Sequence, residues 1–308
     1  MRTVRDPSVM DPALRGASAA IGNFDGVHLG HQHVLDLARG RGGLAVVTFE
    51  PHPRAFFGPK DAAPFRLMNA EAKTNRLEKL GVDLLFELPF DAALAGLKAD
   101  EFAGDILGAA LGLKHVVVGA DFRFGKSRTG TAEALRDMGH NHGFDVTIAE
   151  LLTSGPGAVS STAIRAALSE GAPARAAEML GHWHRIEGPV LHGAKRGRDL
   201  GYPTINMSLD GLHLPALGVY AVLVDVLDGG HVGSYHGVAS LGIRPMFDRG
   251  APNLETFIFN FTGDLYGATV SVALIEYIRP EAAFDGLEAL IAQMDADSAN
   301  ARAILARL

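Results

Sequence analysis

The chain has 308 residues, of which 47% are hydrophobic and 20% are charged, and its formal net charge is −7. This composition is typical of a folded globular protein rather than a disordered one, and the length suits two cores better than one. The parts before and after Leu180 both carry more acidic than basic side chains, which argues against nucleic acid as the main partner.

The sequence contains no cysteine, which excludes disulfides, thiolate catalysis and cysteine-bound metals. The first residues carry charges and no apolar stretch of the kind found in signal peptides. No uninterrupted apolar run approaches the roughly 18 residues that a membrane span needs. We therefore expect a soluble, cytoplasmic protein that binds no membrane.

The first 180 residues alternate apolar strands with helical patterns. The predicted strands are 19–21, 44–49, 82–88, 115–119 and 145–149, and the predicted helices are 31–39, 70–80, 100–111, 131–143, 161–170 and 173–180. Alternation of this kind, with near-continuous apolar strands, is typical of a parallel sheet covered on both faces. Residues 1–180 are therefore predicted to form an α/β, Rossmann-like domain whose ligands bind at the carboxyl ends of the strands.

The pattern changes after residue 180 to closely spaced strands separated by Gly, Pro and Asp. The predicted strands are 183–191, 218–227, 232–241, 254–261 and 269–278, and an amphipathic helix runs from about 284 to 308. Residues 181–308 are therefore predicted to form a small antiparallel β-barrel domain with a C-terminal helix.

The stretch 22–31, Gly-Asn-Phe-Asp-Gly-Val-His-Leu-Gly-His, lies between a predicted strand and a predicted helix. Unpaired N–H groups at a helix start attract phosphate, and Gly30 lets a phosphate approach the backbone closely. His28 and His31 can each donate a hydrogen bond to a phosphoryl oxygen. The alternatives are a zinc site and a pair of surface histidines. Zinc would need further ligands, and His33 points about 200° away around the helix.

This stretch resembles the His-x-Gly-His signature of the nucleotidyltransferase superfamily, and 22–32 resembles the version in bacterial riboflavin kinase/FAD synthetases. Two later segments, 119–125 and 160–165, resemble the Gly-x-Asp-Phe-x-Phe-Gly and Ser-Ser-Thr-x-Ile-Arg strings of the same proteins. The first of these is not a P-loop, because five residues rather than four separate its glycines. Taken alone, Phe122 and Phe124 are more often core residues, and Ser160 can simply cap a helix.

The resemblance implies adenylyl transfer in the first domain: the phosphate of FMN attacks the α-phosphorus of ATP, giving FAD and pyrophosphate. By the same likeness, His28, His31 and Arg165 are catalytic and hold the triphosphate, whose charge Mg²⁺ partly offsets. The implied nucleotide-binding residues are Gly22, Asn23, Phe24, Gly30, Asp121, Ser161 and Thr162. The implied flavin-binding residues are His52, Pro53, Phe122 and Phe124, although the prolines of 48–53 are also consistent with a rigid turn alone.

The stretch 193–206 combines three glycines and three basic residues with the run Tyr-Pro-Thr-Ile-Asn. By composition alone, a polyphosphate and metal site and a solvated basic hairpin are equally favoured. The stretch resembles the ATP and Mg²⁺ signature of riboflavin kinases, which implies phosphorylation of riboflavin to FMN. The residues implied are Gly193, Lys195, Arg198 and Gly201 for the nucleotide, Thr204 and Asn206 for the metal, Glu255 as catalytic base, and Arg302 for the flavin.

The second domain departs from the family pattern at three positions, one of which is Asn260 in place of a common aspartate. Ile205 replaces the usual alanine and adds bulk within the expected metal-binding turn, and Met246 replaces a threonine and loses a hydroxyl near the nucleotide. These departures bear on kinase rate and affinity more than on the existence of the activity.

The leading hypothesis is a bifunctional enzyme that uses riboflavin, FMN and ATP, with FMN and FAD as products and a monomer or weak oligomer as its working form. One alternative is an FMN adenylyltransferase with a weakened kinase domain. The other is a flavin-binding module without turnover, which retention of Glu255 disfavours because binding alone needs no base.

Overall fold

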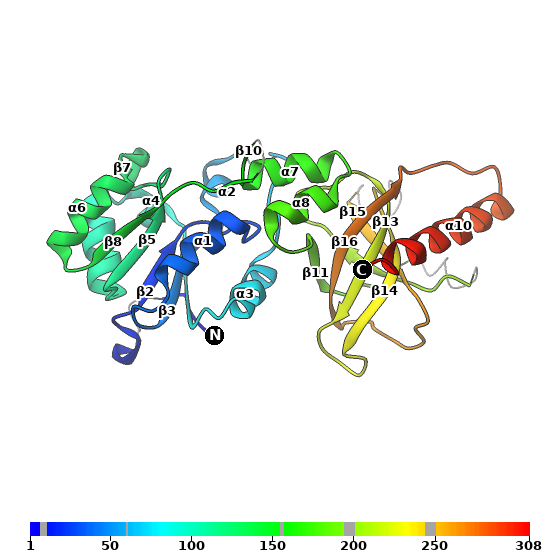
Figure 1. The fold of residues 1–308 in the computed structure, drawn as a ribbon, viewed down its shortest axis with the longest axis horizontal. Helices are drawn as coiled ribbons and strands as arrows, with labels where there is room; N and C mark the ends of the chain where they lie inside the picture. Colours follow the sequence, from blue (N-terminus) through cyan, green and yellow to red (C-terminus); the bar gives the residue numbers. More distant parts are fainter. Residues whose placement is uncertain (7–10, 60, 155–156, 194–200, 244–250) are drawn as a thin grey trace. The chain divides into compact units, whose positions relative to one another are not determined.

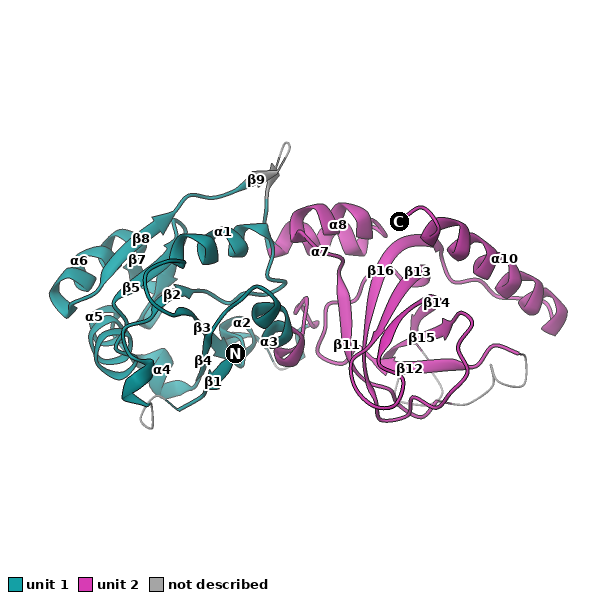
Figure 2. Cartoon of the chain, turned by 60° about the horizontal axis from the view of Figure 1, so that its bottom comes forward, with its two compact units in different colours: residues 1–62, 73–160 teal, residues 63–72, 161–308 magenta. Residues whose placement is uncertain are grey.

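The computed structural model describes residues 1–6, 11–59, 61–154, 157–193, 201–243 and 251–308. The chain divides into two compact units, coloured separately in Figure 2. Residues 1–62 and 73–160 form the first unit, and residues 63–72 and 161–308 form the second. None of the described helices combines the length and the apolar composition needed to cross a membrane.

The first unit is built on a six-stranded parallel sheet with the strand order β1-β4-β3-β2-β5-β8 (Figure 2). These strands are β1 (Arg2–Val4), β2 (Ser18–Ile21), β3 (Leu44–Glu50), β4 (Leu84–Pro89), β5 (His115–Gly119) and β8 (Asp145–Ala149). The parallel α/β architecture is as predicted. In this sheet, the edge strand β1 was not predicted, because its three residues are too few to give a periodic signal.

Helices cover both faces of this sheet. They are η2 (Pro12–Leu14), α1 (Leu29–Ala38), α2 (Pro53–Phe57), α3 (Ala70–Lys79), α4 (Ala92–Gly96), α5 (Ala99–Glu101), the π-helical η3 (Phe102–Ala110), η4 (Lys126–Arg128) and α6 (Ala132–His142). Phe102 of η3 and Leu135 of α6 pack with Phe86 and Val116 in one hydrophobic cluster. The helix α1 packs on β2, β3 and β5 and buries Leu35. Two small strand pairs complete the unit, β6 (Arg123–Phe124) with β7 (Gly130–Thr131) and β9 (Thr153–Ser154) with β10 (Gly157–Ala158).

The second unit contains a six-stranded antiparallel sheet in the order β11-β16-β13-β14-β15-β12. Its strands are β11 (Arg185–Pro189), β12 (Thr204–Ser208), β13 (Gly218–Val226), β14 (Gly233–Ile243), β15 (Pro252–Ile258) and β16 (Thr269–Arg279). An isolated bridge from Leu191 to Asn206 brings the two edge strands together, so the sheet is nearly closed. Closure of this kind confirms the predicted small antiparallel barrel.

In the part of the second unit that the structure describes, the helices are α7 (Ser161–Ser169), α8 (Pro173–Leu180) and α10 (Leu287–Leu305). The last helix packs outside the barrel against β13, β14 and β16, where Ala301 and Leu305 lie buried beside Ala221 and Ile275 (Figure 1). The predicted C-terminal helix is therefore confirmed.

The stretch around Ile205 differs from the sequence expectation. Residues 204–208 form the strand β12, and Ile205 points inward and packs against the barrel core. The prediction that Ile205 adds bulk to a metal-binding turn was wrong, because polar and apolar residues alternate here as they do in a strand with one buried face. The bulk of Ile205 therefore fills the barrel. Met246, another of these departures, lies outside the described residues.

The helices α7 and α8 belong to the second compact unit, together with the segment 63–72. In this unit, Leu67 packs against Ile164 and Leu168 of α7 in a small hydrophobic cluster. The division of the two activities at residue 180 is a separate matter from this packing, and it stays a prediction.

Candidate active sites

The turn that follows β2 holds the first candidate site. The N–H of Gly22 donates to the carbonyl of Val47 at 3.1 Å, and the Thr48 hydroxyl donates to the carbonyl of Asn23 at 3.2 Å. Phe24 and Val27 are both buried and have positive φ angles, of 52° and 43°. Bulky residues rarely adopt this conformation, and it is concentrated at functional sites, where packing and hydrogen bonds hold it.

His28 and His31 lie stacked at the start of α1, with ring centroids 3.7 Å apart and an interplanar angle of 20°. His28 is the N-cap residue, and its Nδ1 accepts from the backbone N–H of His31 at 3.3 Å. A neutral His28 therefore carries its proton on Nε2. A Cβ on Gly30 would come within 3.1 Å of the His28 ring, so any side chain there would displace it.

The imidazole of His31 is held neutral. Burial is the main reason that the pKa of His31 lies well below its usual range, and the neighbouring His28 and Lys73 lower it further. The Nδ1 of His31 is also buried, with no hydrogen-bond partner among the described residues. A buried polar atom left unpaired at a helix start is a natural contact for an oxygen of a bound ligand. His31 is thus arranged to bind a ligand without adding a full positive charge.

His52 and Pro53, predicted to bind flavin, lie at the start of α2, directly beyond the carboxyl end of β3. His52 is the N-cap residue, and its Nδ1 accepts from the backbone N–H of Arg54 at 3.0 Å. Both residues are half-buried. The rigid-turn interpretation is therefore consistent with the structure, and a flavin contact remains a prediction.

Asp121, Phe122 and Phe124 follow β5. Asp121 is exposed, whereas the two phenyl rings stack at 5.5 Å, and Phe124 belongs to the core beside Phe102. A Cβ on Gly130 would lie 2.6 Å from the Phe124 ring, which shows how closely this ring is enclosed. Phe122 is only partly buried, so of the two rings it has the surface that a ligand needs.

Ser161, Thr162 and Arg165 share the first turns of α7 in the second unit. The Arg165 guanidinium donates to the Thr162 hydroxyl at 3.2 Å and to the carbonyl of Phe65 at 3.3 Å. The spacing of three residues brings the Thr162 and Arg165 side chains to one side of the helix. The Thr162 and Arg165 side chains therefore lie together near the start of α7. A nucleotide contact at this place remains a prediction.

The second candidate site lies on the outer face of the barrel, on β12 and β15. In the strand register, Asn206 pairs with Glu255, and Thr204 pairs with Phe257. Directly paired residues point to the same face, so Thr204, Asn206 and Glu255 are close neighbours. The Asn206 amide oxygen accepts from the Asn253 amide at 3.0 Å, which fixes its orientation.

Gly193 lies against this cluster. A Cβ there would be 2.3 Å from the Asn206 amide nitrogen, so only glycine fits without moving the Asn206 side chain. Lys195 and Arg198, the other predicted nucleotide-binding residues of this loop, lie outside the described residues.

A hollow of about 490 Å³ opens beside the cluster, between the barrel and α10. It is lined by Gly201, Tyr202, Phe257, Asp295, Ser298, Ala299 and Arg302. The Tyr202 hydroxyl donates to Asp295, and its ring meets Phe257 edge-on at 4.9 Å. The Arg302 guanidinium lies over the Phe259 ring at 3.9 Å. Two predicted residues, Gly201 and Arg302, thus line one hollow with aromatic and polar walls, as small-molecule sites commonly do.

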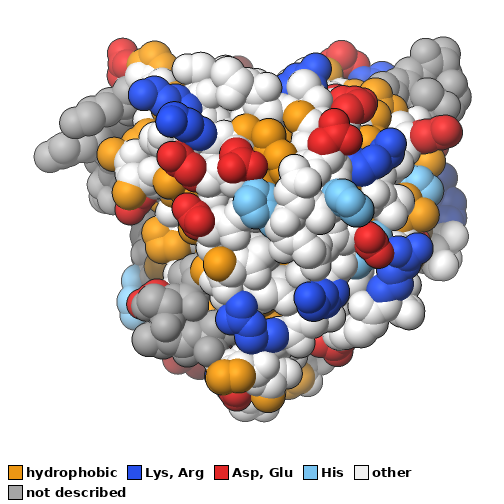
Figure 3. Space-filling model, turned by 90° about the vertical axis from the view of Figure 1, so that its left-hand side faces the viewer, with side chains coloured by type: hydrophobic (Ala, Val, Ile, Leu, Met, Phe, Trp, Pro, Cys, Tyr) orange, Lys and Arg blue, Asp and Glu red, His pale blue; other side chains and the backbone are white. Residues whose placement is uncertain are grey.

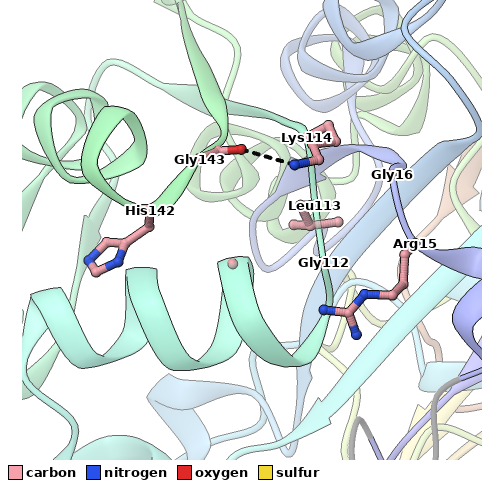
Figure 4. A pocket seen from close by; sticks show the side chains of 8 residues that line it. Arg15, Gly16, Gly112, Leu113, Lys114, His142 and Gly143 are labelled. Carbon is pink, nitrogen blue, oxygen red and sulfur yellow. Dashed lines mark hydrogen bonds between the residues drawn. The ribbon is translucent and has the colours of Figure 1, made fainter.

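Another hollow, of about 320 Å³, lies at the opposite edge of the parallel sheet, where β2, β5 and β8 begin (Figure 4). Its cations serve the fold: Arg15 donates to the carbonyl of Ala109 near the end of η3, and Lys114 donates to that of Gly143 after α6. Figure 3 shows basic and acidic side chains intermixed on the side of α6. We therefore do not treat this edge as a candidate site.

Sequence reasoning missed several residues beside these two clusters. Lys73 of α3 lies next to Thr48, and Asp295 and Ser298 of α10 line the hollow in the second unit. The one available signal is that Lys73 precedes the buried Leu77 by four residues, which places a lysine on the apolar stripe of its helix. Nothing in the sequence places α10 beside Tyr202.

Comparison with known proteins finds two family matches along the chain. The family model described as FAD synthetase matches residues 10–163, and the riboflavin kinase model matches residues 180–305. The chain is 43% identical to a bifunctional riboflavin kinase/FMN adenylyltransferase of Pseudomonas fluorescens, over 99% of this chain and 98% of that protein. It is 39% identical to the Escherichia coli K12 protein of the same name, over 93% and 92%.

The fold is also found in a crystal structure named as a macrolide-efflux protein from Streptococcus pneumoniae. The TM-score is 0.81 at 31% sequence identity, and the match covers 96% of each chain. The two family matches identify a transferase that acts on nucleotide and flavin substrates. The chain belongs to the bifunctional riboflavin kinase/FMN adenylyltransferase family.

Proposed function

We propose that this chain makes FAD from riboflavin in two ATP-dependent steps, with the named clusters as its catalytic machinery. The barrel phosphorylates riboflavin to FMN, and the parallel-sheet domain transfers an adenylyl group to FMN. The observation that carries the proposal is that each unit holds its own cluster of phosphate-handling groups: the stacked histidines in one, and the Asn206–Glu255 pair in the other.

In the kinase step, we assign Glu255 as the general base. It takes the proton of the ribityl 5′-hydroxyl as that oxygen attacks the γ-phosphorus of ATP, and ADP leaves. Support comes from the strand register, which puts Glu255 directly opposite Asn206. The hollow that contains Gly201 and Arg302 is the proposed place of the flavin ring, with Gly193 letting the nucleotide approach.

Magnesium is the metal that this family pattern implies for the kinase. The Thr204 hydroxyl and the Asn206 amide supply oxygen donors on one strand face, which suits a hard cation that keeps several waters. These residues therefore fit the metal, and Thr204 and Asn206 are the proposed ligands. When bound, the ion offsets the negative charge of the phosphates.

In the adenylyl-transfer step, a phosphate oxygen of FMN attacks the α-phosphorus of ATP, and pyrophosphate leaves. His28 and the neutral His31 donate hydrogen bonds to the oxygens on which charge builds up, and the start of α1 adds its own N–H groups. We assign nucleotide contacts to Gly22, Asn23, Phe24, Gly30, Asp121, Ser161, Thr162 and Arg165. His52, Pro53 and Phe122 are the proposed flavin contacts, and Phe124 supports Phe122 from the core.

The test is to measure the two products separately with the full chain. ADP release is followed with riboflavin and ATP, and pyrophosphate release with FMN and ATP. His28→Ala with His31→Ala should lower FAD formation by about 10³-fold or more and leave FMN formation unchanged. Glu255→Gln should lower FMN formation by about 10²–10⁴-fold and leave FAD formation from supplied FMN unchanged.

Loss of both activities in either variant would contradict independent sites. Normal pyrophosphate release with little ADP release from the wild-type chain would instead indicate a weakened kinase domain. Flavin binding with neither product would favour a module without turnover. The absence of cysteine suits a reducing compartment, and we propose the cytoplasm as the place of action.

A further inference from the structure

A buried lysine lies beside the histidine site, and nothing in the proposed mechanism uses it. Lys73, on α3, is only 2% exposed. Its ammonium donates to the Thr48 hydroxyl at 3.3 Å and lies 3.7 Å from the Glu50 carboxylate. Removing an ammonium group from water is costly unless other groups compensate for it, and lysine is almost never fully buried without partners.

The partners of Lys73 lead directly to the turn that carries the histidines. Thr48 is fully buried, and it receives the hydrogen bond from Lys73 while it donates its own to the carbonyl of Asn23. Asn23 precedes Phe24, whose strained backbone and ring, 5.0 Å from His31, form one wall of the site. One continuous chain of contacts therefore runs from the ammonium to the histidine pair.

We infer that Lys73 is a positioning residue for adenylyl transfer: through Thr48 it holds the Asn23–Phe24 turn in place, and it supplies a fixed positive charge to the floor of the site. This inference rests on the proposed function of the histidine pair. A hydroxyl that both accepts and donates has one orientation, so the carbonyl of Asn23 is fixed as well. Glu50, at 29% exposure, balances the charge from the side of the solvent.

The charge of Lys73 has a second consequence, for protonation. The titratable groups that act on His31 are His28, on the same helix, and Lys73, from α3; Phe24 contacts the ring but carries no charge. Burial is the largest cause of the low pKa of His31, and the charges of His28 and Lys73 lower this pKa further. Removing the ammonium raises the pKa of His31. His31 then becomes protonated at a higher pH than in the wild-type enzyme, and activity is lost at that higher pH.

The experiment compares Lys73→Met, Thr48→Val and Lys79→Met in the full chain. Lys79 lies on the same helix but is exposed, so it controls for the loss of a lysine. We expect Lys73→Met to lower kcat for FAD formation by about tenfold or more and to shift the acid limb of its pH profile upward. Thr48→Val removes only the link, so it should lower kcat without that shift. Lys79→Met should match the wild type.

FMN formation by the same protein samples serves as the internal reference, and thermal unfolding of each variant is recorded. The inference is overturned if Lys73→Met keeps the wild-type kcat and pH profile. If Lys73→Met does not fold, the Thr48→Val variant tests the inference instead. A wild-type kcat for FAD formation in Thr48→Val also overturns the inference. A wild-type enzyme that releases no pyrophosphate from FMN and ATP contradicts the proposed function itself, which separates the two failures.

Discussion

At the scale of single residues, the histidine pair shows how a fold sets chemical character. Imidazole has a usual pKa near 6.5, so an exposed pair would gain charge in mildly acidic solution. Burial and stacking keep His31 neutral instead. A neutral donor can bind a phosphoryl oxygen in every state of the reaction without holding the pyrophosphate product as a cation would.

This protonation state gives a pH prediction. A lowered pKa means that His31 stays neutral until the pH falls below the usual imidazole value of 6.5. The rate of FAD formation from FMN should therefore fall on the acid side only below that pH. The measurement is a pH profile of kcat, with riboflavin phosphorylation in the same buffers as reference. An acid limb at or above pH 6.5 would show that His31 is not held neutral.

Gly193 allows a sharper test in the second unit. A Cβ at this position would approach the Asn206 amide nitrogen to 2.3 Å, so Gly193→Ala should displace Asn206 and lower FMN formation by about tenfold or more. Gly188→Ala is the matched control, since a Cβ there meets nothing within 4 Å. ADP release from riboflavin and ATP measures the effect. Equal rates in the two variants would contradict a role for the Gly193–Asn206 contact.

The limits of sequence reasoning are also visible at the residue level. The positions of His28, Gly30, Thr204 and Asn206 follow from motifs read along the chain. Lys73, in contrast, contacts Thr48, a residue 25 positions earlier in the sequence. A pattern read along one helix shows that a lysine occupies an apolar stripe, but not which strand it meets.

At the scale of elements, the strands and helices with a clear period were predictable, and the short ones were not. All five predicted strands of the first domain are present, because buried parallel strands read as apolar runs. The strand β12 was read as a turn, since its five residues lie within a polar motif. Its antiparallel pairing with β15, which brings Asn206 opposite Glu255, depends on tertiary register that no local pattern specifies.

The helix α10 is anchored to the barrel by an ion pair, and this gives a stability prediction. Asp297 is 4% exposed, and both its oxygens accept from the Arg279 guanidinium, at 2.9 Å and 2.7 Å. Asp297→Asn breaks a buried pair and should lower the free energy of unfolding by about 3 kcal/mol. Denaturant unfolding of the full chain checks this, with the exposed Glu288→Gln as control. An unchanged midpoint would mean that the pair does not anchor α10.

At the scale of the whole molecule, the compact units and the matched families follow different boundaries. The riboflavin kinase match begins at residue 180. The second compact unit consists of residues 63–72 and 161–308, so it includes chain that precedes this match. Within that unit, Asn69 donates to the carbonyl of Glu187 at 2.8 Å, and the N–H of His213 donates to the carbonyl of Arg66 at 2.7 Å. The barrel is thus stabilised by two segments of the chain that precede the kinase match, 63–72 and 161–179.

Fragments of the chain test this arrangement. The fragment 181–308 lacks α7 and α8, whose cluster includes Ile164 and Leu168, and loses the bond from the N–H of Ala216 to the carbonyl of Leu168. We expect 161–308 to melt about 4 °C or more above 181–308. Thermal unfolding of the two purified fragments measures the difference. Equal melting temperatures would show that the two helices add nothing to the barrel.

The placement of residues 63–72 in the second unit also bears on biosynthesis. The ribosome synthesises residues 63–72 before any strand of the barrel. The residues that this segment contacts in the folded chain, including Glu187 and His213, have therefore not been made when the segment leaves the exit tunnel. Completion of the second unit therefore has to wait until translation nears its end. In a stalled nascent chain, residues 63–72 would lack their native contacts.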